Sequence, residues 1–103
     1  MGGEPTWVPP ADVYRAQNQV IINVELPGVD DGGIAIDTAM DGGRCTLLVR
    51  GERAASPGEC GALQLERSYG PFVREFVLPE GARPAERRVR CEDGVLRIEI
   101  PIG

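Results

Sequence analysis

The stretch that decides the fold is residues 91–101, which read CEDGVLRIEIP. Asp93 and Gly94 form a tight turn of the kind that joins two antiparallel strands, and the residues after the turn alternate strictly between apolar and polar side chains. Residues 88–92 supply the first arm of this hairpin. Alternation with a period of two is typical of a strand that is buried on one face. The sequence therefore predicts a β-hairpin over residues 88–100.

Alternating segments bounded by turn residues recur upstream of this hairpin. With 14 Gly and 9 Pro in 103 residues, the chain has many turns and little room for long helices. We expect an all-β fold, an antiparallel β-sandwich of seven to eight strands with an immunoglobulin-like arrangement. The further strands expected are residues 12–15, 19–26, 34–40, 44–53 and 72–78, with a single turn at 84–86 and a long loop at 54–65 that carries a short strand near Leu63 and Leu65.

The length of the chain suits one domain. We expect a short N-terminal arm at residues 1–10, a domain at 11–101 and a C-terminal stub at 102–103. The net charge of −5 disfavours nucleic acid and anionic membrane surfaces as partners, because both need clustered basic residues. No apolar run approaches the roughly 20 residues that span a bilayer, and a basic, apolar leader is not apparent. A cytoplasmic location is therefore expected.

The sequence offers little for catalysis. It contains no His, which removes Ser/His/Asp and Cys/His sites, and no Gly-rich phosphate-binding loop. The acidic pairs at 30–31 and 92–93 fall in predicted turns, where Asp beside Gly is expected for backbone reasons. We expect neither an enzyme nor a bound cofactor or metal.

The three cysteines, Cys45, Cys60 and Cys91, are an odd number without CxxC spacing. This pattern indicates neither a disulfide framework nor a zinc site, and favours thiols in a reducing compartment. Cys60 lies in a Gly-rich stretch of the long loop. The alternative for Cys60 is an exposed thiol that oxidises or cross-links subunits.

Several segments follow one another in an order and spacing that resemble the α-crystallin domain of the small heat-shock proteins. The resemblance covers residues 7–101. One such motif alone would be weak, whereas the set in register is specific. The segments are WVPPADVY at 7–14, ELPGV at 25–29, GER at 51–53, ERSYGPF at 66–72, the strand leading to LPEG at 78–81, and GVL at 94–96 with its alternating partners Ile98 and Ile100.

The resemblance implies a homodimer in which the loop at 54–65 crosses to the sheet edge of the partner. Members of the family usually carry longer regions on both sides of the domain, so a dimer, or a piece of a longer protein, is favoured here over a large homo-oligomer. By resemblance, Arg74 is the interface arginine and pairs with Glu52 or Glu66 of the other subunit, while Leu63 and Leu65 lie in the exchanged loop. The alternative is that Arg74 lines a solvated strand face, where an ion pair contributes at most about 1 kcal/mol.

The resemblance also implies an apolar groove that takes client segments or Ile-X-Ile tags. Such a groove lies between the strand at 34–40 and the strand at 89–92, and four residues are its candidates. Sandwich alternation gives each of them a second interpretation, as ordinary core. Ile100 and Ile102 have the spacing of a tag, although Ile100 is equally the last inward residue of its strand. The groove candidates are Ile34, Ile36, Val89 and Cys91.

The function that the resemblance implies is that of an ATP-independent holdase, which binds unfolding client proteins and suppresses their aggregation. The alternative is an adaptor similar to the p23 and CS-type co-chaperones, which bind a specific folded partner.

Overall fold

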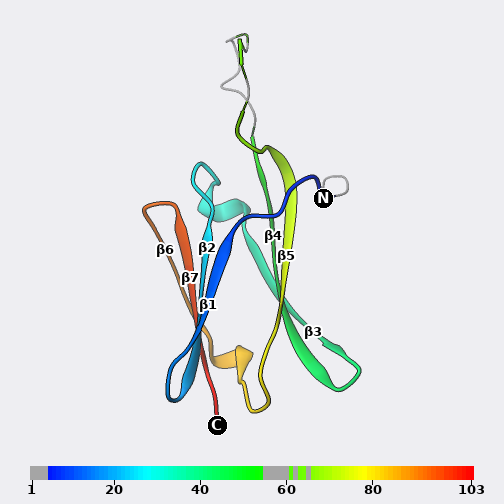
Figure 1. Ribbon diagram of the computed structural model, residues 1–103, viewed down its shortest axis with the longest axis vertical. Coiled ribbons are helices and arrows are strands. Elements are labelled where there is room, and N and C mark those ends of the chain that lie inside the picture. The colour runs from blue at the N-terminus through cyan, green and yellow to red at the C-terminus, as the bar shows by residue number, and fades with distance from the viewer. Residues whose placement is uncertain (1–4, 55–60, 62, 65) are drawn as a thin grey trace.

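Antiparallel strands form two sheets that pack face to face in the computed structural model, which describes residues 5–54, 61, 63, 64 and 66–103 (Figure 1). One sheet has the strand order β1-β2-β7-β6 and the other has the order β3-β4-β5. The predicted antiparallel β-sandwich is confirmed. The strands are β1 (Ala11–Arg15), β2 (Gln19–Glu25), β3 (Ala35–Asp41), β4 (Arg44–Arg53), β5 (Gly70–Val77), β6 (Arg88–Glu92) and β7 (Val95–Pro101).

The core comes from the central strands and β5. Inward residues of the neighbouring strands β2 and β7 lie side by side on the inner face of the first sheet, with Ile98 paired to Ile22 and Ile100 paired to Val20. The outer strands β1, β3 and β6 contribute none of the fully buried apolar side chains in the described chain. The apolar core is therefore enclosed by the central strands and β5, whereas β1, β3 and β6 cover it only in part. The core residues are Val20, Ile22, Val24, Leu26, Leu47, Val49, Phe72, Phe76, Leu78, Leu96, Ile98 and Ile100.

The predicted turn between β6 and β7 is also a docking point. Asp93 and Gly94 have positive φ values of 54° and 77°, as the two central residues of a tight hairpin turn require. The Gly94 carbonyl accepts a hydrogen bond of 2.7 Å from the amide of Leu26. A Cβ atom at position 94 would lie 3.1 Å from Cα of Pro27. The GVL and ELPG motifs are thus in direct contact.

The segment before β1 crosses from one sheet to the other (Figure 1). The amide of Thr6 donates to the carbonyl of Pro71 in β5 at 2.8 Å, and the amide of Glu25 in β2 donates to the carbonyl of Pro10 at 3.0 Å. Between these two anchors Pro9 is fully buried. Residues 6–10 therefore lie extended against the open side of the sandwich between β1 and β5.

Two single turns of 3-10 helix complete the fold, η1 (Asp31–Gly33) and η2 (Pro84–Glu86), of which the second is the turn expected at 84–86. Within the described ranges, neither has the length or hydropathy needed to span a bilayer. The short strand expected near Leu63 and Leu65 falls on a stretch of which residues 55–60, 62 and 65 lie outside the described residues. Leu63 itself is fully exposed and is not in a strand.

Candidate functional site

One open side of the sandwich runs along β3 and β6, the outer strands of the two sheets. In β3, Ile36 lies opposite Val49 of β4 and Met40 lies opposite Cys45, so both share the face of β4 that bears the core. In β6, Val89 lies opposite Ile98 of β7. These inward-facing side chains stay partly open to solvent because no further strand lies beside β3 or β6 in the described chain. Met40 is 70% exposed and Val89 is 46% exposed.

We call this surface the β3–β6 edge, formed by Ile34, Ile36, Thr38, Met40, Val89 and Cys91. The four residues predicted to line a groove all lie on it. Ile34, Ile36 and Cys91 are partly buried and pack against the core, whereas Val89 is exposed. Sequence reasoning missed Thr38 and Met40, although both have the same parity along β3 as Ile36. Packing against the core fits the second interpretation for Ile34, Ile36 and Cys91, and the groove role of the four residues stays a prediction.

Arg87 links the two strands of this edge. Its Nη1 donates to the carbonyl of Pro84 in η2 at 2.8 Å, and its Nη2 lies 3.4 Å from the carbonyl oxygen of Ile36 in β3. The side chain is half-buried. Because Arg87 directly precedes β6 and Ile36 is the second residue of β3, this contact holds the start of β6 near the start of β3.

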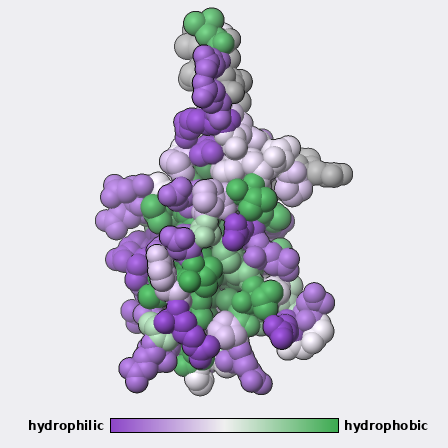
Figure 2. Space-filling view, viewed as in Figure 1, coloured by the Kyte–Doolittle hydropathy of each residue, from purple (hydrophilic) through white to green (hydrophobic). Residues whose placement is uncertain are grey.

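The opposite open side, between β1 and β5, holds an open cleft of about 380 Å³ that sequence reasoning did not identify. Apolar residues gather along the middle of the face shown in Figure 2, between the two sheets. Val13, Tyr14 and Val77 line the cleft and are each more than half exposed. No sequence signal separated these residues from other strand positions, because the cleft depends on how the two sheets stack.

Within the described part of the chain, the residues predicted for a dimer interface make separate contacts. Arg74 donates from Nη1 to the carbonyl of Pro9 at 3.2 Å, and its guanidinium lies 5.2 Å from the ring centre of Phe76. Glu52 is exposed on β4, and exposed Glu66 accepts a hydrogen bond from Gln64. Leu65 and Cys60 lie outside the described residues. The interface role of this set stays a prediction.

A buried arginine at the end of β4 connects motifs that are far apart in the sequence. Arg53 is 7% exposed and donates from Nε to Ser68 at 2.8 Å and from Nη1 to the Pro27 carbonyl at 2.6 Å. Its guanidinium lies 4.3 Å from the ring centre of Trp7, close enough for a cation–π interaction. Burial, followed by the nearby charge of Arg67, lowers the pKa of Arg53.

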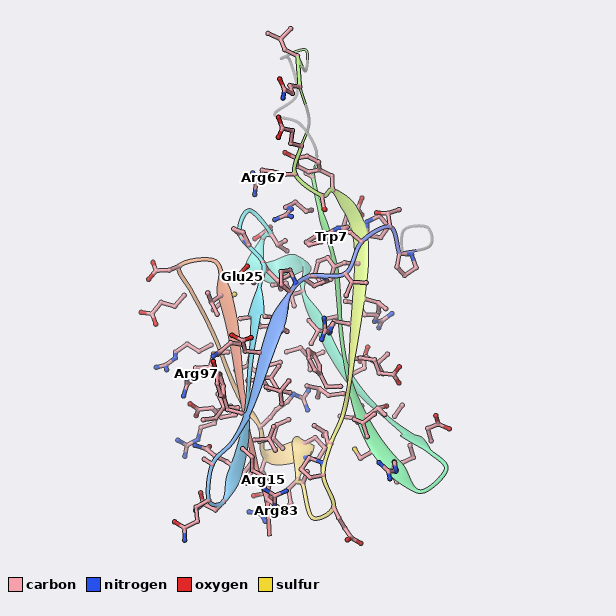
Figure 3. All side chains as sticks on the ribbon, viewed as in Figure 1. Trp7, Arg15, Glu25, Arg67, Arg83 and Arg97 are labelled. Atoms are coloured by element: carbon pink, nitrogen blue, oxygen red, sulfur yellow. The ribbon has the colours of Figure 1, made fainter. Side chains whose placement is uncertain are left out.

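Trp7 completes this arrangement. Its indole Nε1 donates to the carbonyl of Gly70 at 2.9 Å, and its ring centre lies 5.2 Å from that of Phe72. Figure 3 places Trp7 and Arg67 at the same end of the sandwich. Sequence reasoning placed Trp7 and Arg53 in separate motifs and missed their contact. The cluster has a structural role, since it fastens residues 6–10 to β4 and β5.

The residues with the spacing of a tag lie in and beside the last strand. Ile100 is completely buried opposite Val20, which is the position of the last inward residue of β7. The amide of Ile102 donates to the carbonyl of Asn18 at 2.9 Å, and its side chain packs partly against the core. To act as a tag for another subunit, this segment would have to leave its own sandwich. In the described part of the chain, no cluster of His, Cys, Asp or Glu has the size of a metal site.

The sequence matches a model of the Hsp20/alpha crystallin family over residues 12–102. It is 33% identical to the 17.9 kDa class II heat shock protein of Glycine max, over 93% of this chain and 66% of that protein. A small heat-shock protein from Xylella fastidiosa has a TM-score of 0.79 at 35% identity, covering 93% of this chain and 86% of that one. The hspA structure from Xanthomonas axonopodis has a TM-score of 0.79 at 34% identity, covering 94% and 95%. The chain spans 56 to 66% of the length of the first curated relatives that it matches.

Proposed function

The chain belongs to the Hsp20/alpha crystallin family, and from this premise we propose that it is an ATP-independent holdase, which binds apolar segments of unfolding proteins and keeps them from aggregating. The observation that carries the proposal is the β3–β6 edge, where Met40 and Val89 hold apolar surface open to solvent on two outer strands. An outer strand offers backbone groups to a further strand, and a partner segment that pairs there also covers the apolar side chains. Such capture requires no catalytic step.

The strength of a single contact limits how such a protein works. Burying two Ile side chains of a client contributes roughly 3 to 6 kcal/mol. Association costs roughly 4 to 15 kcal/mol in lost freedom of motion. One edge therefore binds weakly, and several edges joined in one assembly retain a client through their raised effective concentration.

We further propose that the chain dimerises by exchange of the segment at 54–65, with Arg74 paired to Glu52 or Glu66 of the other subunit. The outer strand β1 and the partly apolar cleft beside it support this proposal, because an unpaired strand margin is the surface that an exchanged strand covers. Native mass spectrometry of Arg74→Ala and of a chain without residues 54–65 tests it. We expect both changes to lower the dimer fraction, and an unaltered mass distribution for both would refute the exchange.

Suppression of aggregation tests the holdase proposal directly. Light scattering of unrelated heated clients should fall near a stoichiometric ratio of chain to client. Ile36→Glu places a charge on the β3–β6 edge and should abolish the protection, whereas Ala39→Glu places the same charge on the other face of β3 as a matched control. If a folded Ile36→Glu chain still protected the clients fully, the β3–β6 edge would be excluded as the surface that binds them.

An adaptor for one folded partner would leave unrelated clients unprotected in the same assay. A cytoplasmic location is proposed as well, supported by an odd cysteine count without CxxC spacing. Cell fractionation would test it.

A further inference from the structure

Three arginines gather on the outer face of β6 and β7, and we call Arg88, Arg90 and Arg97 the arginine face. Arg90 lies directly opposite Arg97, and Arg88 lies opposite Glu99. A hollow of about 240 Å³ is lined by these arginines together with Val89 and Glu99. Arg97 lies on the outer side of the sheet in Figure 3, on the flank where hydrophilic residues gather in Figure 2.

The charges of this face are not balanced. Three arginines share the face with two carboxylates: among the described residues Glu99 is the one carboxylate that lines the hollow, and Glu92 lies on the same face of β6 two residues beyond Arg90. The Nε of Arg97 donates to Oε2 of Glu99 at 2.8 Å. This hydrogen bond chiefly lowers the pKa of Glu99, and the charges of Arg97, Arg90 and Arg88 add to the effect. In the part of the chain that the structure describes, Arg88 and Arg90 have no ion pair. Like charges on opposed strand positions are unfavourable, so the face gains from a further anion.

The fold already contains one strand whose sequence satisfies part of this face. Ile98 and Ile100 of β7 are buried on the inner side, and Glu99 between them faces outward opposite Arg88. An apolar–acidic–apolar triplet therefore lies against one margin of β6. The other margin of β6 carries no strand in the described chain.

A strand that docks on that margin would meet the same two faces. It would lie about 4.8 Å from β6, with its side chains alternating between the inner and outer sides. Its inward residues would meet Val89 and the rest of the β3–β6 edge, and its outward residues would lie beside Arg88 and Arg90. Side chains opposed across such a pair have Cβ atoms about 5 Å apart, within reach of an ion pair.

We propose that the outer margin of β6 selects extended segments in which apolar and acidic residues alternate, with Arg88 and Arg90 binding the acidic side chains. The inference rests on the proposed capture of segments at the β3–β6 edge and names the class of segment that binds best. Charge complementarity favours this occupant. The chain as a whole carries a net charge of −5, so an acidic segment is attracted by the local positive charge of this face and not by the charge of the whole molecule.

Labelled peptides measure this preference. Fluorescence anisotropy would compare peptides in which Ile alternates with Glu, with Gln or with Lys, and one in which Glu alternates with Ser, each at low and high salt. We expect the Ile-Glu peptide to bind about 3- to 20-fold more tightly than the Ile-Gln peptide, as two exposed ion pairs provide. The Ile-Lys peptide should bind more weakly than either. High salt should reduce the differences in affinity among the three peptides, because it screens their charges.

Two double variants complete the test. R88Q/R90Q should bind the Ile-Glu and Ile-Gln peptides with equal affinity, while R15Q/R44Q removes the same charge from β1 and β4 and should keep the preference. Equal affinity of the unaltered chain for these two peptides would refute the inference and leave the holdase proposal intact. Tight binding of the Glu-Ser peptide would also refute it, because the face would then be a site for any polyanion. Failure of all three Ile peptides to bind would count against the β3–β6 edge itself.

Discussion

Replacement of Gly51 by alanine probes how tightly the sandwich is packed at the end of β4. A Cβ atom at this position would lie 2.8 Å from Cζ of Phe72 and 2.9 Å from the carbonyl oxygen of Gly33. Ordinary contacts between carbon atoms lie at about 3.5 to 4.0 Å. Phe72 is 2% exposed and packs on Trp7, so its ring cannot move aside easily. The Gly33 oxygen belongs to the backbone and cannot change rotamer. We expect Gly51→Ala to lower the free energy of unfolding by about 1 to 3 kcal/mol through overpacking.

Thermal unfolding followed by circular dichroism measures this loss, which corresponds to a drop in Tm of about 4 to 8 °C per kcal/mol for a domain of this size. Gly32→Ala is the matched control, because a Cβ atom there would meet no heavy atom within 4 Å. Phe72→Leu shortens the side chain that clashes, so Gly51→Ala should cost less in that background. An unchanged Tm for Gly51→Ala would refute the packing argument, and strictly additive losses would show that Phe72 is not the obstacle.

Three further predictions concern other parts of the fold. Gly94→Ala imposes a side chain on a backbone with φ of +77°, and should cost about 1 to 3 kcal/mol in the free energy of unfolding by urea; an unchanged urea midpoint would contradict it. Trp7→Ala removes the ring that contacts Phe72 and should cost about 3 kcal/mol by the same measurement, whereas a loss within error would show that residues 6–10 are not fastened by this contact. Because Arg97 lowers the pKa of Glu99 below its ordinary value of 4.5, the carboxylate stabilises the fold above that pH and loses this effect as the pH falls through the folded value. The urea midpoints of the unaltered chain and Glu99→Gln should therefore differ at pH 7 and converge in acid, and a constant difference would contradict the assignment.

Strand positions were predictable from the sequence because burial of one face imposes alternation directly. The strands expected at 44–53 and 88–92 agree with β4 and β6, and those expected at 12–15, 19–26, 34–40, 72–78 and 95–100 agree within two residues at each end. The turn at Asp93 and Gly94 was equally predictable from the sequence, since a tight hairpin needs positive φ at both positions and Asp-Gly adopts it readily. Local rules thus specify most of the fold.

The contacts that join distant motifs were not predictable in the same way. Arg53 ends a strand and would ordinarily be assigned to the surface, yet it is buried by partners from separate segments, namely Trp7, Pro27 and Ser68. The exposure of Met40 on an inward-facing position likewise depends on the stacking of β3 near β6, which alternation alone does not specify.

Because residues 6–10 run extended along the sandwich, the two termini of the described chain lie at opposite ends of it. A fluorescent protein or affinity handle joined ahead of Thr6 would emerge next to Tyr69 and Gly70, because Thr6 bonds to the carbonyl oxygens of Tyr69 and Pro71. The same handle joined after Gly103 would emerge at the other pole, near η2 (Figure 1). Handles at opposite termini thus hinder different surfaces, so comparing the two fusions reports which pole of the molecule a partner approaches.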